Sequence, residues 1–312
     1  MTDVSVNFTG LNTQKIQTWI LALRAPFFTA SITPLLIGMA IAFYETKVFD
    51  LGLGLLTLIS GIAIQAGTNL ANDYYDQSTD GINGNFTQFN GGSRVIQNDI
   101  ISPRSILTAS IVSFIVGIIT AIIILINTQG WALLIFLALA VLLGFFYTAL
   151  PISLSYKGLG EIAVFVGFGP LGVYAAYYIQ LGNVNSSIIL IASLPIALLI
   201  SMVLFLNEFP DHEADSAAGK KTLVVSIGKR RSIRIYTLGM IVSYISLILA
   251  VIVFSLPLVL LLPILTLPLA MKAIIHASHH YEEIIELLPA NGITILVHFS
   301  FGLLMALSFV LA

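Results

Sequence analysis

Long apolar runs, separated by short polar stretches, dominate this chain from residue 19 onward. A helix needs about 20 mostly apolar residues to cross the hydrocarbon core of a bilayer. Runs of suitable length predict nine membrane-spanning helices, at residues 19–44, 51–75, 105–126, 131–149, 160–180, 187–207, 233–254, 256–275 and 292–311. Only Ser255 and Pro257 divide the seventh span from the eighth, in a run long enough for two crossings. The pattern predicts an all-α, polytopic membrane bundle.

Composition supports a membrane protein and excludes several other classes. Of 312 residues, 58% are hydrophobic and 9% are charged, far below the ~25% charged residues of soluble domains. A net charge of -2 without a basic tail argues against a nucleic-acid partner, and the lack of cysteine excludes disulfides and thiol catalysis. The polar first 18 residues lack a signal-peptide pattern, so the first apolar run is expected to be retained. We expect a single transmembrane domain over residues 1–312.

The basic residues predict the orientation of the bundle. With the amino terminus in the cytoplasm, twelve of the 13 Lys and Arg residues fall on the cytoplasmic side and only Lys47 falls outside. The positive-inside rule therefore predicts a cytoplasmic amino terminus and a carboxyl terminus on the far side of the cell membrane. The acidic stretches described next then lie on the cytoplasmic face.

Two acidic stretches share one spacing and end equivalent spans. Asn72, Asp76 and Asp80 follow the pattern N-x3-D-x3-D at the end of the second span, with Asp73 beside them. The same pattern ends the sixth span at Asn207, Asp211 and Asp215. This repeat predicts two related four-helix halves plus a ninth helix. Positions i, i+4 and i+8 line one helix face, so each stretch presents a column of oxygen atoms. A solvated helix end would explain one stretch alone, but ionisable groups at membrane depth are costly, which favours a functional site.

Two columns of oxygen ligands are typical of a hard-cation site, and Mg²⁺ is the natural occupant because it takes one or two carboxylates plus phosphate oxygens. Basic residues stand nearby in the sequence, namely Arg94, Lys157, Lys220 and Lys221. Carboxylates surrounded by Lys and Arg suit an anionic phosphate bridged to them by metal ions. The glycines of "GINGN" and "NGGS" would let backbone N–H groups approach that phosphate, although such glycines more often only form turns.

These stretches resemble a known family. "NDYYDQSTD" and "NEFPDHEADSAAGKKTL" are similar to the two motifs of the membrane-bound aromatic prenyltransferases, the UbiA superfamily. "FNGGSRVIQ" and "YTALPISLSYKGLGE" look most like the 1,4-dihydroxy-2-naphthoate polyprenyltransferase branch, which makes menaquinone precursors. Glu208 and Lys157 depart from the pattern of that branch. The resemblance covers nearly the whole chain.

The resemblance implies Mg²⁺-dependent transfer of a polyprenyl group from an allylic diphosphate to a hydrophobic aromatic acceptor. Pyrophosphate leaves, and the electron-rich ring attacks the allylic cation. The implied metal ligands are Asn72, Asp76, Asp80, Asn207, Asp211 and Asp215. The four Asp residues of that set and Lys157 would be catalytic. Substrate-binding roles would fall to Arg24, Asn72, Asp73, Arg94, Tyr147, Lys220 and Lys221. Arg24 fits equally well as a side chain reaching the membrane interface.

Aromatic residues are candidates for shielding the allylic cation by their ring faces. The set comprises Tyr74, Tyr147, Phe168 and Tyr174, for which ordinary packing is the simpler interpretation. His276, His279 and His280 are a weaker candidate for a second metal site, and a solvated loop is the simpler reading. Glu161 is expected to form a hydrogen bond at the start of the fifth span.

Three alternatives compete with this function. Phosphatidyl-alcohol transferases require D-G-x2-A-R, and here Asp80-Gly81 is not followed by Ala-Arg. A cation transporter would carry ionisable groups near the bilayer midplane, whereas these gather at one face. A prenyltransferase that makes archaeal lipids, with a glycerol phosphate alcohol as acceptor, remains the nearest rival.

Overall fold

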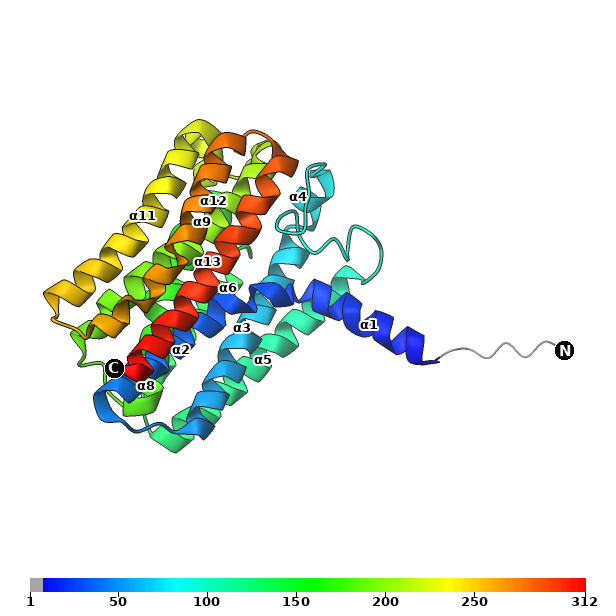
Figure 1. Ribbon diagram of the computed structural model, residues 1–312. Helices are drawn as coiled ribbons and strands as arrows, with labels where there is room; N and C mark the ends of the chain where they lie inside the picture. The colour runs from blue at the N-terminus through cyan, green and yellow to red at the C-terminus, as the bar shows by residue number, and fades with distance from the viewer. Residues whose placement is uncertain (1–7) are drawn as a thin grey trace.

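The computed structural model describes residues 8–312, with side chains from Lys15 onward, and all regular structure in this range is helical (Figure 1). The elements, η marking short 3-10 or π segments, are α1 Phe8–Ala22, η1 Ala25–Phe28, α2 Thr29–Thr46, α3 Leu51–Tyr75, α4 Gln77–Ile82, α5 Pro103–Thr128, α6 Leu133–Phe145, η2 Leu154–Lys157, α7 Gly160–Val166, η3 Gly167–Leu171, α8 Gly172–Leu181, α9 Ser187–Ala217, α10 Leu223–Ile227, α11 Lys229–Val253, η4 Leu258–Thr266, α12 Leu267–His280 and α13 Ile284–Leu311. The predicted all-α class is confirmed.

Eight helical segments in the described range are long and apolar enough to cross a membrane, and α6 is a shorter apolar helix. Together they account for the nine predicted spans. The split between the seventh and eighth spans is confirmed, because α11 ends at Val253 and η4 begins only at Leu258. Between them, Ser255 adopts a positive φ of 50°, which a continuous helix does not allow.

The predicted start of the first span, at residue 19, is wrong. The chain leaves the helix after Ala22, and Arg24 adopts a left-handed conformation with φ 50°. Pro26 follows at the start of η1, where its missing N–H costs no hydrogen bond, and the spanning segment runs from Ala25 to Thr46. Helix α1 consequently points away from the bundle (Figure 1).

Helix α9 is also longer than the apolar pattern predicts. It continues from Ser187 to Ala217, past the predicted end at residue 207, and contains Pro210 in its interior. Its neighbours α7, α11 and α13 pack against it, which explains how its polar final turns remain helical. The second acidic stretch therefore lies inside a helix.

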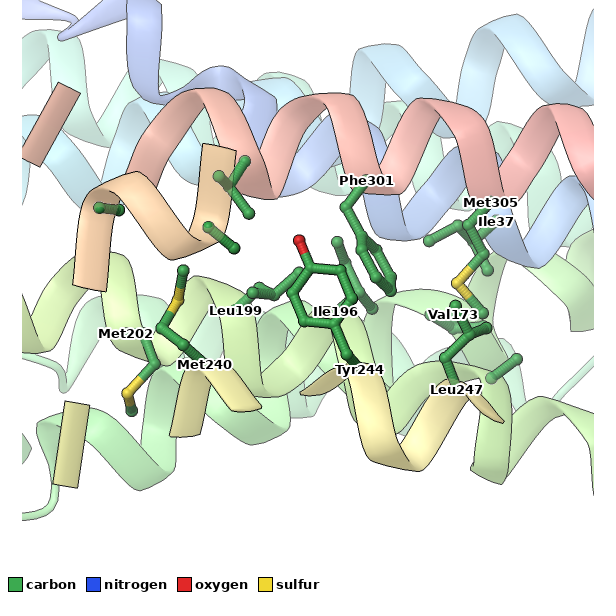
Figure 2. Close-up of a cluster of buried hydrophobic side chains, with 14 of the residues drawn as sticks. Ile37, Val173, Ile196, Leu199, Met202, Met240, Tyr244, Leu247, Phe301 and Met305 are labelled. Carbon is green, nitrogen blue, oxygen red and sulfur yellow. The ribbon is translucent and has the colours of Figure 1, made fainter. Parts of the chain in front are cut away.

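The main hydrophobic core is built around α9. Ile196, Leu199 and Met202 of this helix meet Tyr244 of α11 and Phe301 of α13 (Figure 2). The rings of Tyr244 and Phe301 pack edge to face, with centroids 5.4 Å apart, and the Tyr244 hydroxyl bonds to Thr266 Oγ1 at 2.7 Å. A buried phenol thus keeps its hydrogen bond, as burial in an apolar core requires.

The outer surface of the bundle is apolar. Helix α5 shows this clearly, because Ile115, Ile119 and Ile126 are all exposed. Such a surface suits a lipid environment and would be unfavourable in water. The polar end of the bundle, where α4 and the loop after it lie, is where the two acidic stretches meet (Figure 1).

Candidate active site

The first acidic stretch bends where α3 passes into α4. Helix α3 ends at Tyr75, and Asp76 forms the junction with φ -91° and ψ 4°. The Asp76 N–H still donates to the Asn72 carbonyl at 2.9 Å, and the Asp80 N–H donates to the Asp76 carbonyl at 2.8 Å. These helix-like bonds keep Asn72, Asp76 and Asp80 on one side, as their spacing predicts, and all three line the same cavity.

The second stretch reaches that cavity from an uninterrupted helix. Asn207, Asp211 and Asp215 all lie in α9 and all line the cavity wall. The Asn207 side-chain oxygen accepts a hydrogen bond from Asn291 Nδ2 of α13 at 2.8 Å. The two columns of side chains therefore line one cavity.

A loop between α4 and α5 connects the two stretches. Asp211 Oδ1 accepts hydrogen bonds from Asn83 Nδ2, at 2.6 Å, and from Asn90 Nδ2. The Gly91 N–H also donates to the Asp211 carboxylate. Three donors from one loop thus hold an acidic side chain that follows about 120 residues later in the sequence.

The same loop packs closely against the first stretch. Gly92 has φ 76°, and a Cβ atom at this position would overlap Asp80 Oδ2, so glycine is required for both conformation and space. Arg94 Nη1 donates to the Asp80 carbonyl, and its guanidinium lies 4.2 Å from the centroid of the Phe86 ring. The "NGGSR" glycines therefore shape the acidic cavity.

Arg24 and Asp73 form a partly buried ion pair beside the cavity. Arg24 Nη2 lies 2.6 Å from Asp73 Oδ1, and Asp73 also accepts hydrogen bonds from the Ser93 N–H and the Ser93 hydroxyl. Arg24 lines the cavity, whereas Asp73 does not. Asp73 therefore anchors Arg24 and the loop, and Arg24 faces the space where a ligand would bind.

Lys220 joins the two acidic stretches electrostatically. Its Nζ lies 3.0 Å from Asp76 Oδ2, 3.4 Å from Asp215 Oδ1 and 4.7 Å from the Tyr156 ring centroid. Burial disfavours charge on Lys220, but the two carboxylates outweigh burial and raise its pKa, so the ammonium group stays charged.

Tyr156 supports Asp76 from the other side. Its hydroxyl donates to Asp76 Oδ1 at 2.8 Å and lies 3.0 Å from Thr79 Oγ1. Burial and the charge of Asp76 raise the pKa of Tyr156 to about 12, so this phenol is a neutral donor. Nearby, burial raises the pKa of Asp80 to about 7, despite the charge of Arg24.

Acidic side chains outnumber basic ones in the lining of the cavity. Five acidic side chains line it (Asp76, Asp80, Glu208, Asp211 and Asp215), against the two cations Arg24 and Lys220. Asp80 Oδ2 is buried without a hydrogen-bond partner. Buried carboxylate oxygens are normally paired, so this arrangement is suited to a ligand that brings positive charge or donors.

A second, apolar cavity adjoins the first. Its lining comes mainly from α2, α3, α6, α7 and α8. Gln65, Thr68, Tyr147, Val164 and Phe168 line both spaces. The empty volumes are about 1160 Å³ for the polar cavity and 990 Å³ for the apolar one. A molecule with a charged head and an apolar tail would fit this pair of spaces.

Several predicted site residues lie outside the polar cavity. Lys157 Nζ donates to the Pro151 carbonyl at 3.4 Å, and Lys221 is exposed. Neither of these residues, nor Arg94, lines the cavity. Lys220 and Arg24 are therefore the cations that face it, and a direct phosphate contact from Lys157 is not supported by its position.

The structure also locates the aromatic, histidine and Glu161 candidates. Phe168 and Tyr147 line the cavities, whereas Tyr74 and Tyr174 pack against hydrophobic clusters. Among the described residues there is no group of three His, Cys, Asp or Glu side chains close enough to hold one metal ion, and His276, His279 and His280 are no exception. Glu161 Oε1 accepts from the Leu223 N–H at 3.0 Å.

Sequence reasoning missed Asn83, Asn90 and Tyr156, which hold the acidic side chains in place. Nothing in their spacing distinguishes them from ordinary loop residues. Gln65 was detectable as a polar residue inside an apolar run; it accepts from the Ser31 hydroxyl at 2.5 Å and donates to the Phe27 carbonyl at 2.7 Å.

Residues 31–309 match the model of the UbiA prenyltransferase family. The chain belongs to this family. This UbiA-family chain is 28% identical over 288 residues to a 2-carboxy-1,4-naphthoquinone phytyltransferase of Synechocystis sp., covering 92% of this chain and 91% of that protein. It is 32% identical over 222 residues to a 1,4-dihydroxy-2-naphthoate octaprenyltransferase of Bacillus subtilis, covering 71% of this chain and 70% of that protein.

A solved structure shares the fold. A UbiA homolog from Archaeoglobus fulgidus, bound to GPP and Mg²⁺, superposes with a TM-score of 0.61 at 17% identity, over 92% of this chain and 99% of that chain. The resemblance to the UbiA superfamily is confirmed, and the protein is an integral membrane prenyltransferase.

Proposed function

We propose that this prenyltransferase transfers a polyprenyl group from an allylic diphosphate to an aromatic acceptor, 1,4-dihydroxy-2-naphthoate, with Mg²⁺ as cofactor and in the service of menaquinone biosynthesis. The observation that carries the proposal is the pair of adjoining cavities. Two acidic columns and two cations surround the polar cavity, and it continues into an apolar cavity between helices.

The residues of the polar cavity fit Mg²⁺. Five acidic side chains exceed two cations, and Asp80 Oδ2 is buried without a partner. Mg²⁺ takes one or two carboxylates and completes its shell with phosphate oxygens and water, so it does not need three acidic side chains at one point. Asn72, Asp76 and Asp80 would hold one ion, and Asn207, Asp211 and Asp215 another.

Mg²⁺ bound there supplies positive charge that stabilises the leaving pyrophosphate. The chain itself supplies the remaining parts. Arg24 and Lys220 face the cavity, where they take up phosphate charge as the C–O bond of the donor breaks. The prenyl tail lies in the apolar cavity. Tyr147 and Phe168, in the wall common to both cavities, border the allylic cation.

The names of two relatives favour an aromatic acceptor. One is named for 1,4-dihydroxy-2-naphthoate and the other for 2-carboxy-1,4-naphthoquinone, and both names denote a naphthalene-type ring. The ring of 1,4-dihydroxy-2-naphthoate would attack the allylic cation through the carbon that bears its carboxylate, form a C–C bond and lose that carboxylate as CO₂. A glycerol phosphate acceptor would attack through oxygen and yield an ether.

The test uses purified protein, Mg²⁺, geranylgeranyl diphosphate and a panel of acceptors that includes carboxyl-labelled 1,4-dihydroxy-2-naphthoate. We expect a product of prenylated-ring mass together with labelled CO₂, and no product in excess chelator. An ether product, or turnover of another acceptor but not of the naphthoate, contradicts the acceptor. Full activity in chelator contradicts the metal.

We also propose that the polar cavity faces the cytoplasm, on the strength of the distribution of Lys and Arg. The chain has no cysteine, so single cysteines at the exposed positions Ser78 and Ser216 report the orientation. They should label with an impermeant thiol reagent in inside-out vesicles but not in intact cells. Labelling in intact cells contradicts the orientation.

A further inference from the structure

Glu208 is an acidic residue of the polar cavity that the two metal-binding columns do not include. It directly follows Asn207 in α9, so its side chain points about 100° around the helix from the face of Asn207, Asp211 and Asp215. It nevertheless lines the cavity. Its exposed fraction is 8%, and its Oε2 atom is buried without a hydrogen-bond partner.

The neighbours of Glu208 differ from those of the other four acidic residues. Its side chain lies beside Glu161 of α7, another acidic group, and a hydrogen bond between these two carboxyl groups requires a proton on one of them. The Leu223 N–H donates to Glu161 Oε1 at 3.0 Å. Among the ion pairs of the described residues, none reaches Glu208, whereas Asp76 and Asp215 share Lys220. Tyr147 lines the polar cavity together with Glu208 and also lines the apolar cavity.

A buried carboxyl oxygen without a donor destabilises the folded protein by the lost hydration of that oxygen. Such an arrangement is explained when a bound molecule supplies the missing donor. The phosphates of the prenyl diphosphate are anionic and offer no hydrogen-bond donor. The aromatic prenyl acceptor does offer hydrogen-bond donors, because each of its ring hydroxyls carries one O–H. The position of Glu208, near Tyr147 and the apolar cavity, also suits an aromatic ring.

We propose that Glu208, positioned by Glu161, binds the acceptor by accepting a hydrogen bond from a ring hydroxyl. The protein would therefore select hydroxylated rings over their methyl ethers. This inference rests on the proposed function, in that it takes the acceptor to be aromatic, and it assigns to Glu208 a role separate from metal and donor binding.

The test compares acceptor kinetics of the wild type, Glu208→Gln and Glu208→Leu, using 1,4-dihydroxy-2-naphthoate and its two monomethyl ethers at saturating geranylgeranyl diphosphate. In the wild type, one of the two ethers should react at least 10-fold less efficiently than the parent acceptor. Glu208→Leu should raise the acceptor KM at least 10-fold and reduce the discrimination against that ether to less than 3-fold. Glu208→Gln, which keeps an acceptor oxygen, should fall between.

Matched controls separate this role from others. Glu213→Gln and Glu213→Leu change an exposed glutamate of the same helix and should leave both values within 2-fold. The donor KM and the Mg²⁺ requirement of the Glu208 variants should also stay within 2-fold. Glu161→Gln should raise the acceptor KM less than Glu208→Leu does, since Glu161 acts through Glu208.

The outcomes are distinguishable. A wild type that prenylates no aromatic ring contradicts the proposed function. A wild type that prenylates the ring, while Glu208→Leu keeps its acceptor KM and its ether discrimination, contradicts this inference alone. A variant whose donor KM or Mg²⁺ requirement shifts as much as its acceptor KM shows Glu208 to be a metal-site or structural residue. If Glu208→Leu does not fold, Glu208→Gln decides: a raised acceptor KM with reduced ether discrimination supports the inference, and wild-type values of both contradict it.

Discussion

The two acidic stretches have the same spacing, yet the protein builds them differently. In the first, the helix is interrupted at Asp76, and a lysine and a phenol hold that carboxylate. In the second, α9 continues without a break, and side-chain amides from a distant loop hold Asp211. One spacing therefore produces two local environments.

The two stretches differ mainly in which groups face the charge of their carboxylates. Lys220 offsets part of the charge of Asp76, whereas the amides of Asn83 and Asn90 donate hydrogen bonds to Asp211 without neutralising it. Asp211 therefore has hydrogen-bond donors but no ion-pair partner at contact distance among the described residues. Lys220 also contacts Asp215, so a single ammonium group serves both stretches.

The largest expected effect comes from removing a carboxylate from either stretch. Asp76→Ala and Asp211→Ala should each lower kcat by about 10³-fold, because each removes charge aimed at the leaving group. The measurement is product formation by purified protein at saturating Mg²⁺. If one variant keeps near-normal activity, the two stretches are not both part of the site.

Removing the shared cation should lower stability, in addition to the loss of its contact with the donor phosphates. Lys220→Met leaves Asp76 and Asp215 without their common partner, and a broken buried ion pair destabilises a protein by about 3–5 kcal/mol. Thermal unfolding in detergent should show a clear drop in Tm. Lys221→Met, at the exposed neighbouring position, is the control and should change Tm little. Equal Tm values for the two variants would show that Lys220 does not bridge the stretches.

The side-chain amides that donate to Asp211 should have a smaller effect, on the Mg²⁺ requirement. Asn83→Ala and Asn90→Ala each leave Asp211 with one side-chain amide donor besides the Gly91 N–H, so each should raise the Mg²⁺ concentration for half-maximal activity about 3-fold. The double variant should raise it more than the product of the two single effects, because the donors substitute for one another. Strictly multiplicative effects would show that the two amides act independently.

Lys157 provides the smallest expected effect. Its ammonium group bonds to the Pro151 carbonyl and does not line the cavity. Lys157→Met should therefore leave kcat and the donor KM within about 2-fold of the wild type, as is usual for surface substitutions. A large rise in the KM for the prenyl diphosphate would instead support the phosphate contact that the sequence predicts for Lys157.

The sequence predicts the architecture well because apolar length and motif spacing report directly on helices in a bilayer. It identifies the motif aspartates and Lys220, which the structure brings to one cavity. It fails at Arg24, where a left-handed residue ends α1 inside an apolar run, since hydropathy carries no information on φ. It also cannot reveal that Arg94 bonds to the Asp80 carbonyl, because that contact depends on how the loop folds back.

The loop after α4 also has a consequence for biosynthesis. Asn83 and its partner Asp211 are separated by 128 residues, so the partner is synthesised roughly ten seconds later at about 5–20 residues per second. Until α9 enters the membrane, the loop has no second stretch to hold. The polar cavity is therefore completed late, and a nascent chain that lacks α9 cannot bind donor in the way the finished protein does. The nascent chain would become able to bind the prenyl donor when α9 inserts into the membrane, and not when the first helices insert.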